Sequence, residues 1–454
     1  MKKLLFGLFI IIPAMLGVAA ILGIPPSYIA AAPGVGTGIG AKLLCSSKYV
    51  SGFSEEQALE DLVQFSPILN YLNVEFDDNN RRVRTSLFGI RSATASYVPG
   101  IGCAIDYAGF DQRQAFQARE LPVLTSHWPH GTRVETINDD IQSLLDDIVM
   151  RDNNNNLDTR ALLVVHNGRV VAQSYAGGAR ADTPLLGWSM AKSMTAIMLG
   201  NLELRSLLDV NDTPGFLEWA EDSRVDIRIE DLLTMTDGLA FTERYNPGDD
   251  ATAMLFTEPA ASAYVLRQRQ LHAPGSHFNY SSGTANLLSR IFFDRTGGSL
   301  QSAWNDYVAN VVVPMSLQHT VFEADASGVF KGSSYLYASA QDWARMGQLM
   351  LDEGVINGRR IVSRDWVRRS TSPNQSDNGV AYGYQWWLNA GAARLRWPDL
   401  PEDAYAAQGN REQILMVVPS ANAVLVRLGW SDPGYPVNAR FREILDALER
   451  LDNE

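Results

Sequence analysis

Cysteine and histidine are scarce in this chain of 454 residues, and basic residues are outnumbered by acidic ones. The two cysteines and six histidines form neither a Cys/His cluster nor a His-Glu-x-x-His motif, which argues against a zinc enzyme. We expect no metal, and we expect no organic cofactor either. The net charge of −13 argues against a nucleic-acid partner, because such partners bind basic faces. With 46% hydrophobic residues, the chain can still bury a large core.

Lysine is also scarce, with six lysines against 32 arginines, and one lysine stands alone. Lys192 is the only lysine between Tyr49 and Phe330, and it follows Ser189 by three residues in the chain's only Ser-x-x-Lys sequence. If this stretch is helical, the two side chains share a face. A buried lysine can lose its proton, whereas an arginine cannot, and a serine needs a base to become a nucleophile. The alternative is a chance tetrapeptide on an ordinary core helix.

The first 26 residues differ from the rest of the chain. Two lysines precede Leu4 to Ile24, which is 21 residues without a charge. A membrane-spanning helix needs about 20 residues, whereas the apolar core of a signal peptide has about 7–15. We therefore predict that residues 1–26 contain a membrane anchor, spanning at 4–24, with the remainder facing the periplasm or exterior. Small residues such as Ala20 and Ala32 leave cleavage, and a secreted or periplasmic protein, as the alternative.

Residues 27–125 are expected to form a small α+β region. Cys45 and Cys103 both follow the apolar segment, in what should be an oxidising compartment, so a disulfide is expected, with two buried free thiols as the alternative. The pattern predicts one capped helix and three strands, at Glu55 to Gln64, Leu72 to Phe76, Arg81 to Phe88 and Ser92 to Val98.

Residues 126–454 are expected to form the working domain. Strands are predicted early and late in it, in one hairpin around Asn167-Gly168 and a second around residues 419–422. Helices are predicted at 137–149, 229–233, 284–295, 340–351, 364–369 and 438–451, and a polar loop at 152–156. This order favours a single antiparallel sheet built from both ends of the domain, with a helical insertion.

Three motifs occur in an order that is typical of one family. Ser189-Met190-Ala191-Lys192, Tyr280-Ser281-Ser282 and Ala407-Gln408-Gly409 resemble the motifs of penicillin-recognising serine hydrolases. That group includes class C β-lactamases, low-molecular-weight penicillin-binding proteins, related esterases and 6-aminohexanoate-dimer hydrolases. Residues 229–239 and 382–387 look similar to two further segments of the family, the second of them a Gly-Tyr-x-Trp-Trp strand. The resemblance covers about residues 130 to 450.

The resemblance implies both a fold and a mechanism. The fold would be the β-lactamase/transpeptidase-like α/β (α+β) fold, an antiparallel sheet flanked by helices with a helical subdomain. Ser189 would attack a carbonyl and form an acyl-enzyme, and Lys192 would share its proton with Ser189 and Tyr280. Tyr280 would be the base for attack and the acid for the leaving group. The backbone N–H groups of Ser189 and Asn410 would form the oxyanion hole beside Gly409.

Two departures from the family pattern bear on the substrate. Ser282 occupies the third position of the second motif, where relatives often have asparagine, and the serine side chain is shorter than that of asparagine. Ala407 and Gln408 stand where relatives offer a basic group, which puts β-lactam and D-Ala-D-Ala recognition in doubt. Arg411 is close enough in sequence to replace that cation. We therefore expect a small-molecule or peptide-like amide or ester substrate, with a β-lactamase or D-Ala carboxypeptidase as lesser alternatives.

Two other functions stay open. Gly187 to Ala191 approaches the Gly-x-Ser-x-Gly elbow of α/β-hydrolases, but no histidine follows His319 and no parallel βαβ pattern is visible. The alternative from another class is a non-catalytic protein that binds or senses the cell wall with the same fold. The sequence does not indicate the oligomeric state.

Overall fold

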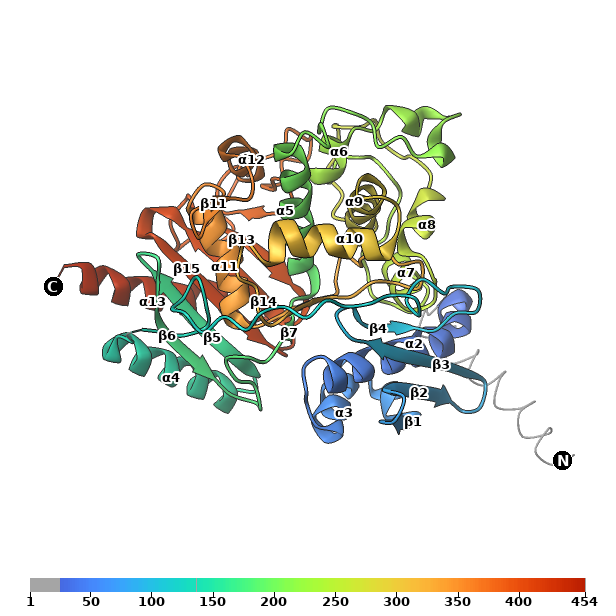
Figure 1. The fold of residues 1–454 in the computed structure, drawn as a ribbon, viewed down its shortest axis with the longest axis horizontal. Coiled ribbons are helices and arrows are strands. Elements are labelled where there is room, and N and C mark those ends of the chain that lie inside the picture. The colour runs from blue at the N-terminus through green and yellow to red at the C-terminus, as the bar shows by residue number, and fades with distance from the viewer. Residues whose placement is uncertain (1–24, 136, 454) are drawn as a thin grey trace, which may run out of the picture.

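The computed structural model describes residues 25–135 and 137–453, so the predicted anchor at 4–24 lies outside the described residues. The first part of the chain, blue in Figure 1, forms two helices and a four-stranded antiparallel sheet of order β1-β2-β3-β4. Its elements are α2 (Pro26–Tyr49), α3 (Glu55–Val63), a 3₁₀ turn (Pro67–Tyr71), β1 (Leu72–Asp77), β2 (Arg82–Leu87), β3 (Arg91–Val98) and β4 (Gly102–Ile105). The predicted helix and three strands are confirmed, and β4 is a fourth strand that its short length concealed.

The larger sheet is assembled from both ends of the remaining chain, as the sequence predicted. Its order is β12-β13-β14-β15-β5-β6, and every pair of neighbours is antiparallel. The strands are β5 (Thr159–His166), β6 (Arg169–Tyr175), β12 (Trp387–Leu388), β13 (Tyr405–Gly409), β14 (Gln413–Val418) and β15 (Ala423–Gly429). Both predicted hairpins, β5 with β6 and β14 with β15, are therefore present.

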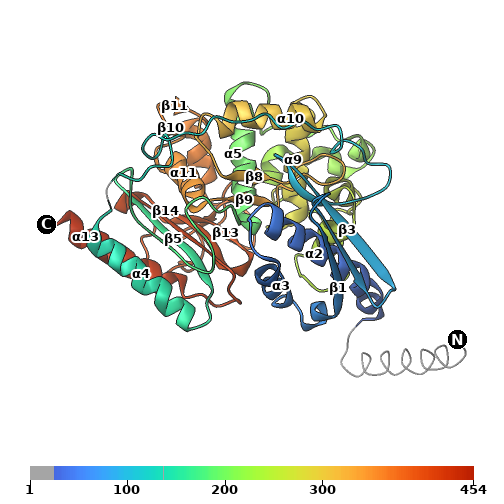
Figure 2. The same ribbon diagram turned by 60° about the horizontal axis from the view of Figure 1, so that its bottom comes forward.

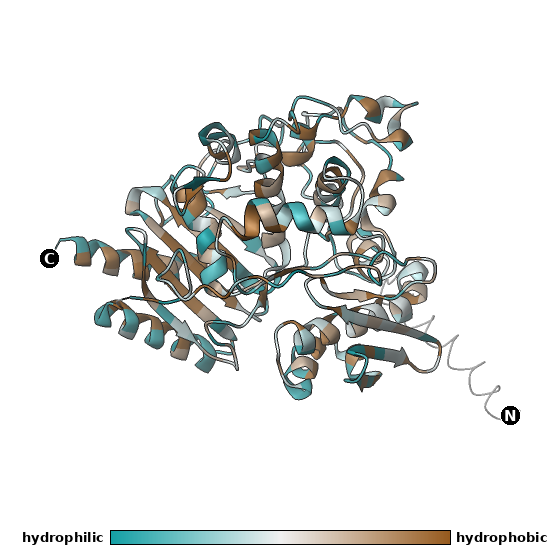
Figure 3. Cartoon of the chain, in the orientation of Figure 1, coloured by the Kyte–Doolittle hydropathy of each residue, from teal (hydrophilic) through white to brown (hydrophobic). Residues whose placement is uncertain are grey.

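Helices cover both faces of this sheet, and its central strands β5, β14 and β15 are buried along their whole length. Because side chains alternate along a strand, Leu162 and Val164 join the core under α4 (Asp139–Asn154) and α13 (Val437–Asp452). Leu163 instead joins the core of the opposite face. Figure 2 shows α4 and α13 over one face, and Figure 3 shows apolar residues concentrated in the sheet.

The chain between β6 and β12 is mostly helical, as predicted. Its helices are α5 (Ala191–Leu204), α6 (Ile229–Leu233), α7 (Asp250–Phe256), α8 (Ala261–Leu266), α9 (Ser282–Arg295), α10 (Leu300–Tyr307), α11 (Ala340–Leu351) and α12 (Arg364–Ser370). Its short strands are β7 (Leu185–Leu186), β8 (Thr320–Phe322), β9 (Leu336–Ala338), β10 (Val355–Ile356) and β11 (Arg359–Arg360). Helix α9 begins two residues before the predicted start, because Ser281 caps it by accepting a hydrogen bond from the Thr284 N–H.

Two local predictions were wrong. The polar stretch 152–156 is not all loop: α4 continues to Asn154, and the fully buried Asp152 accepts hydrogen bonds from Thr159 and Arg440. Arg440 is distant in sequence, so the polarity of the stretch alone was misleading. The stretch 382–387 is not a strand except at Trp387, because Gln385 has a left-handed backbone (φ 62°) that turns the chain.

Helix α2 was missed altogether. Its glycines at alternating positions argue against a helix locally, but they allow close packing. A Cβ atom at Gly38 would lie 2.2 Å from the Phe256 carbonyl oxygen, and one at Gly40 would lie 2.6 Å from the Leu72 side chain. Within the described residues α2 is long and apolar enough to cross a membrane, yet 61% of its most apolar window is buried inside the protein. That degree of burial is typical of a core helix.

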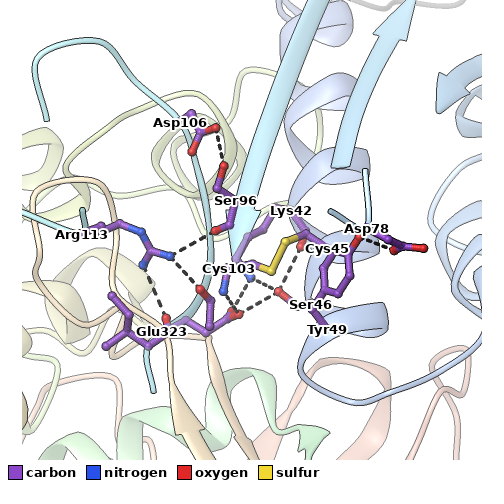
Figure 4. Close-up of a disulfide and its surroundings, with 12 residues drawn as sticks. Lys42, Cys45, Ser46, Tyr49, Asp78, Ser96, Cys103, Asp106, Arg113 and Glu323 are labelled. Atoms are coloured by element: carbon purple, nitrogen blue, oxygen red, sulfur yellow. Dashed lines mark hydrogen bonds and ion pairs between the residues drawn. A yellow bond between two sulfur atoms is a disulfide. The ribbon is translucent and has the colours of Figure 1, made fainter. Parts of the chain in front are cut away.

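The predicted disulfide is present and ties α2 to β4 (Figure 4). Cys45 and Cys103 are joined across a separation of 58 residues. Beside the bond, the fully buried Glu323 forms an ion pair with Lys42 of α2. The same carboxylate accepts hydrogen bonds from Ser46 (2.8 Å) and from the Cys103 N–H (2.7 Å). This buried cluster joins the N-terminal region to the segment after β8.

Candidate active site

Ser189 lies in a tight turn at the start of α5. Residues Trp188–Met190 form a 3₁₀ turn that runs directly into the helix. Gly187 packs so closely on Trp343 that a Cβ atom there would lie 2.2 Å from the indole ring. Trp188 has a left-handed backbone (φ 47°), which costs a non-glycine residue about 1–3 kcal/mol. Local packing therefore restricts the backbone before Ser189 to one conformation.

The structure brings Lys192 to Ser189. The Lys192 Nζ atom lies 2.8 Å from the Ser189 Oγ atom, 3.0 Å from the Ser282 Oγ atom and 3.0 Å from the Ser333 carbonyl oxygen. The side chain is 1% exposed. Burial disfavours the charged amine and lowers the pKa of Lys192 to about 8, while the negative charge of Glu243 opposes this shift. At neutral pH a fraction of Lys192 is therefore neutral and able to accept a proton.

Tyr280 completes this group from the loop before α9. The Lys192 Nζ atom lies 4.8 Å from the centre of the Tyr280 ring. Burial and the charge of Glu243 raise the pKa of Tyr280, whereas a hydrogen bond with Ser189 and the charge of Arg396 lower it in part. The phenol is thus the stable form of this side chain, so at neutral pH it carries a proton that a strongly basic leaving group can take.

Ser282 connects the lysine to an acid that the sequence did not reveal. The Ser282 N–H donates to the Glu243 Oε2 atom at 2.7 Å, and the Ser282 hydroxyl donates to Oε1 at 2.5 Å. Ser282 is fully buried and links Glu243 to Lys192. Glu243 was missed because it stands in a loop between α6 and α7 with no motif around it.

The third motif ends against the nucleophile turn. Gly409 is the last residue of β13, and a Cβ atom there would lie 2.1 Å from the Gly187 carbonyl oxygen and 3.1 Å from the Trp188 side chain. Only glycine allows this approach. It also brings Asn410, the next residue, beside the turn that carries Ser189. The structure thus brings together the three motifs that the sequence singled out.

The cation nearest to the third motif is not the expected one. Arg411 donates to Asp432 at 2.5 Å and stacks 4.3 Å from the centre of the Phe65 ring, so its guanidinium is already engaged. Arg396 instead donates to the Gln408 side chain at 2.7 and 2.9 Å. It also lies 4.0 Å from the centre of the Trp387 ring, which stacks on Tyr280. Sequence spacing could not show this, because Arg396 belongs to an irregular loop.

The arrangement has the parts of a nucleophilic hydrolase site. A serine hydroxyl lies within hydrogen-bonding distance of a buried lysine with a lowered pKa. A phenol adjoins both, and Gly409 packs directly against the nucleophile turn. Such a group can move a proton away from the serine and return one to a leaving group.

Comparisons with known proteins identify the family and the fold. The family model described as Beta-lactamase matches residues 147–449. A 6-aminohexanoate-dimer hydrolase of Paenarthrobacter ureafaciens is 25% identical over 300 residues, which cover 61% of this chain and 74% of that protein. Among solved structures, EstCE1, a hydrolase with promiscuous acyltransferase activity, is similar with a TM-score of 0.54 and 15% sequence identity. The similar region covers 68% of this chain and 97% of the EstCE1 chain. A class C beta-lactamase is similar with a TM-score of 0.51 and 14% sequence identity, and the similar region covers 68% of this chain and 96% of the beta-lactamase chain.

Proposed function

We propose, from the premise that this chain belongs to the Beta-lactamase family, that it is a serine hydrolase that cleaves an amide or ester through a Ser189 acyl-enzyme. Membership supports hydrolysis in general. The observation that carries the specific proposal is the 2.8 Å contact between the buried Lys192 amine and the Ser189 hydroxyl. A lysine with a pKa of about 8 can take the serine proton near neutral pH.

Acylation then proceeds as follows. Neutral Lys192 accepts the hydroxyl proton while the Ser189 Oγ atom bonds to the substrate carbonyl carbon. The N–H groups of Ser189 and Asn410 bind the oxyanion that forms. When the intermediate collapses, the bond from carbon to the leaving oxygen or nitrogen breaks and Tyr280 gives the leaving group its proton. The proton on Lys192 passes to the Tyr280 phenolate and restores both groups.

This order differs from the one that the family resemblance implied, in which Tyr280 was the first base. The electrostatics favour Lys192 for that role, because burial and Glu243 raise the pKa of Tyr280 and make its phenolate scarce. Deacylation reverses the steps, with water in place of the leaving group. The water gives one proton to the pair of Lys192 and Tyr280 as its oxygen bonds to the acyl carbon. The bond from that carbon to the Ser189 oxygen then breaks, and the same pair returns the proton to Ser189.

The third motif bears on the substrate. Ala407 offers no charge, and Arg411 is engaged with Asp432. Arg396 is exposed, and its guanidinium donates to the Gln408 side chain rather than to the nucleophile turn. We therefore propose that neutral esters or simple amides are hydrolysed better than penicillins or cephalosporins. One lost charge-assisted hydrogen bond is worth about 1.5–3 kcal/mol, or roughly ten- to a hundredfold in kcat/KM.

The same proposal includes a location. The disulfide favours an oxidising compartment, and the apolar segment 4–24 would tether the protein to a membrane with the hydrolase outside.

Labelling with a fluorophosphonate tests the proposed function. The full-length protein, in mild detergent, should gain one probe mass on the peptide that contains Ser189. The Ser189→Ala variant should take up no probe and should lose on the order of 10⁴-fold or more in turnover. Ser143→Ala, on the exposed side of α4, is the matched control and should label like wild type. Absence of labelling and of ester turnover in the folded wild type would favour the non-catalytic alternative.

A further inference from the structure

A cavity of about 290 Å³ lies between the N-terminal region and the nucleophile turn. Helix α2 contributes Gly36 and Ile39, and the chain after α3 contributes Phe65 and Leu69. The opposite wall includes Trp188 and Tyr245. This volume is near the lower end of the usual range for ligand pockets, roughly 300 Å³.

The cavity adjoins the proposed catalytic group on two sides. Trp188 is the residue before Ser189 in the same 3₁₀ turn. The Tyr245 hydroxyl donates to Glu243 at 3.4 Å, and Glu243 binds Ser282, which in turn contacts Lys192. These neighbours place the cavity beside Ser189, where we expect one arm of a bound substrate to lie.

The lining indicates what that arm is. No lysine, arginine, aspartate or glutamate is among the residues that line the cavity, and its walls are mainly aliphatic and aromatic. A charged group would lose its hydration there without a partner, whereas an apolar group would gain from burial. We propose that this cavity binds an uncharged, apolar arm of the ester or amide substrate. The inference rests on the proposed function and names the substrate class.

The N-terminal region is thereby a part of the substrate site. Helix α2 and residues 65–69 precede the segment that matches the family model, so this wall is an addition to the shared domain. The wall is firmly held. Gly38 packs on the Phe256 carbonyl, and Phe256 itself lines the cavity. The disulfide ties α2 to β4 within the N-terminal region, and the ion pair of Lys42 with Glu323 ties α2 to the hydrolase domain (Figure 4).

Chain-length profiles test the proposal. The kcat/KM of the full-length protein is measured on p-nitrophenyl esters from acetate to decanoate, and on alkyl acetates from ethyl to decyl. In one of the two series kcat/KM should rise by up to about fourfold for each methylene that is buried. The rise should stop when the cavity is full, at roughly six to ten carbons if a methylene takes about the space of a water molecule. The series that rises identifies the arm as acyl or alcohol.

Two variants show whether this cavity is responsible. Gly36→Leu puts a side chain toward Leu69, so activity on the octyl-length substrate should fall at least tenfold more than activity on the shortest one. Gly34→Leu, on the same helix but outside the cavity lining, is the matched control and should keep the wild-type profile. Should Gly36→Leu fail to fold, Ile68→Glu, at a cavity residue that is 43% exposed, should flatten the profile in the same way.

The outcomes separate the two proposals. Flat profiles in both series, or variants that keep the wild-type preference, would overturn the inference while short esters and Ser189 labelling still supported the hydrolase. If the folded wild type neither labels nor cleaves the shortest ester, the proposed function is wrong and this inference is wrong with it.

Discussion

At the scale of single residues, three titratable groups determine what the site can do at a given pH. Burial lowers the pKa of Lys192 to about 8, and Glu243 opposes that shift. Burial and Glu243 together raise the pKa of Tyr280. The negative charge of Glu243 therefore favours the protonated form of both groups, and its contact with Ser282 makes it part of the electrostatics of the proposed acylation.

The first prediction concerns pH. If neutral Lys192 is the base, kcat/KM should rise as the pH increases through about 8, because below its pKa the amine already carries the proton that it must accept. Glu243→Gln removes the charge that holds that pKa up, so the midpoint should move to lower pH. Stopped assays from pH 5 to 10 on one neutral ester give both midpoints. A midpoint that stays in place, or moves upward, in Glu243→Gln would contradict this assignment.

The second prediction concerns the kind of cation. Lys192→Arg should be nearly as damaging as Lys192→Ala, with losses of several orders of magnitude in kcat, because arginine keeps the charge but does not release its proton. Lys48→Arg, at a half-buried lysine paired with Glu55 and Asp78, is the matched control and should keep full activity. An active Lys192→Arg variant would reduce Lys192 to an electrostatic or packing role.

At the scale of secondary-structure elements, packing partners shape two segments against their local tendencies. The turn at Trp188 has a left-handed backbone, and it is enclosed by Trp343 on one side and Gly409 on the other. Helix α2 stays helical in spite of its glycines because Phe256, Leu72 and Thr85 fill the space beside them. In both cases the contacts come from residues that are distant in the sequence.

The third prediction concerns the disulfide that holds α2. Closure of a loop of this length is worth about 4 kcal/mol in the chain-entropy model, so the double variant Cys45→Ala/Cys103→Ala should lose about 2–4 kcal/mol of unfolding free energy. Urea denaturation measures the change. The variant should also lose more activity on long substrates than on short ones, since α2 forms a wall of the cavity. Unchanged stability would show that the buried cluster around Glu323 holds α2 without the bond.

At the scale of the whole molecule, the N-terminal region is an integral part of the hydrolase rather than a loosely attached domain. Lys42, Cys45 and Ser46 of α2 reach Glu323 and Cys103 in one buried cluster. The division at residues 125 and 126 stays a prediction, and so do the membrane anchor and the outward orientation.

The fourth prediction follows from the length of residues 4–24. Full-length protein should fractionate with membranes and resist extraction by salt and by carbonate, whereas a version that begins at residue 25 should be released. Amino-terminal sequencing of the mature protein supplies the check. A terminus just after Ala20 or Ala32 would show cleavage and a soluble product instead.

The sequence by itself determined the elements that depend on near neighbours. Capped helices such as α3 and α9, the Asn-Gly hairpin, and the spacing of Ser189 and Lys192 all follow from contacts within a few residues. The construction of the sheet from both ends of the domain was also readable, because its predicted strands come early and late in the chain.

Only the tertiary structure decided the contacts that cross the chain. Glu243 meets Ser282 across 39 residues, Arg396 rather than Arg411 faces the stack over Tyr280, and Asp152 finds its partner in Arg440. The physical reason is that a side chain's polarity shows that it needs a partner but not which one. A glycine likewise shows that something comes close, and only the folded chain shows that at Gly38 it is the carbonyl of Phe256.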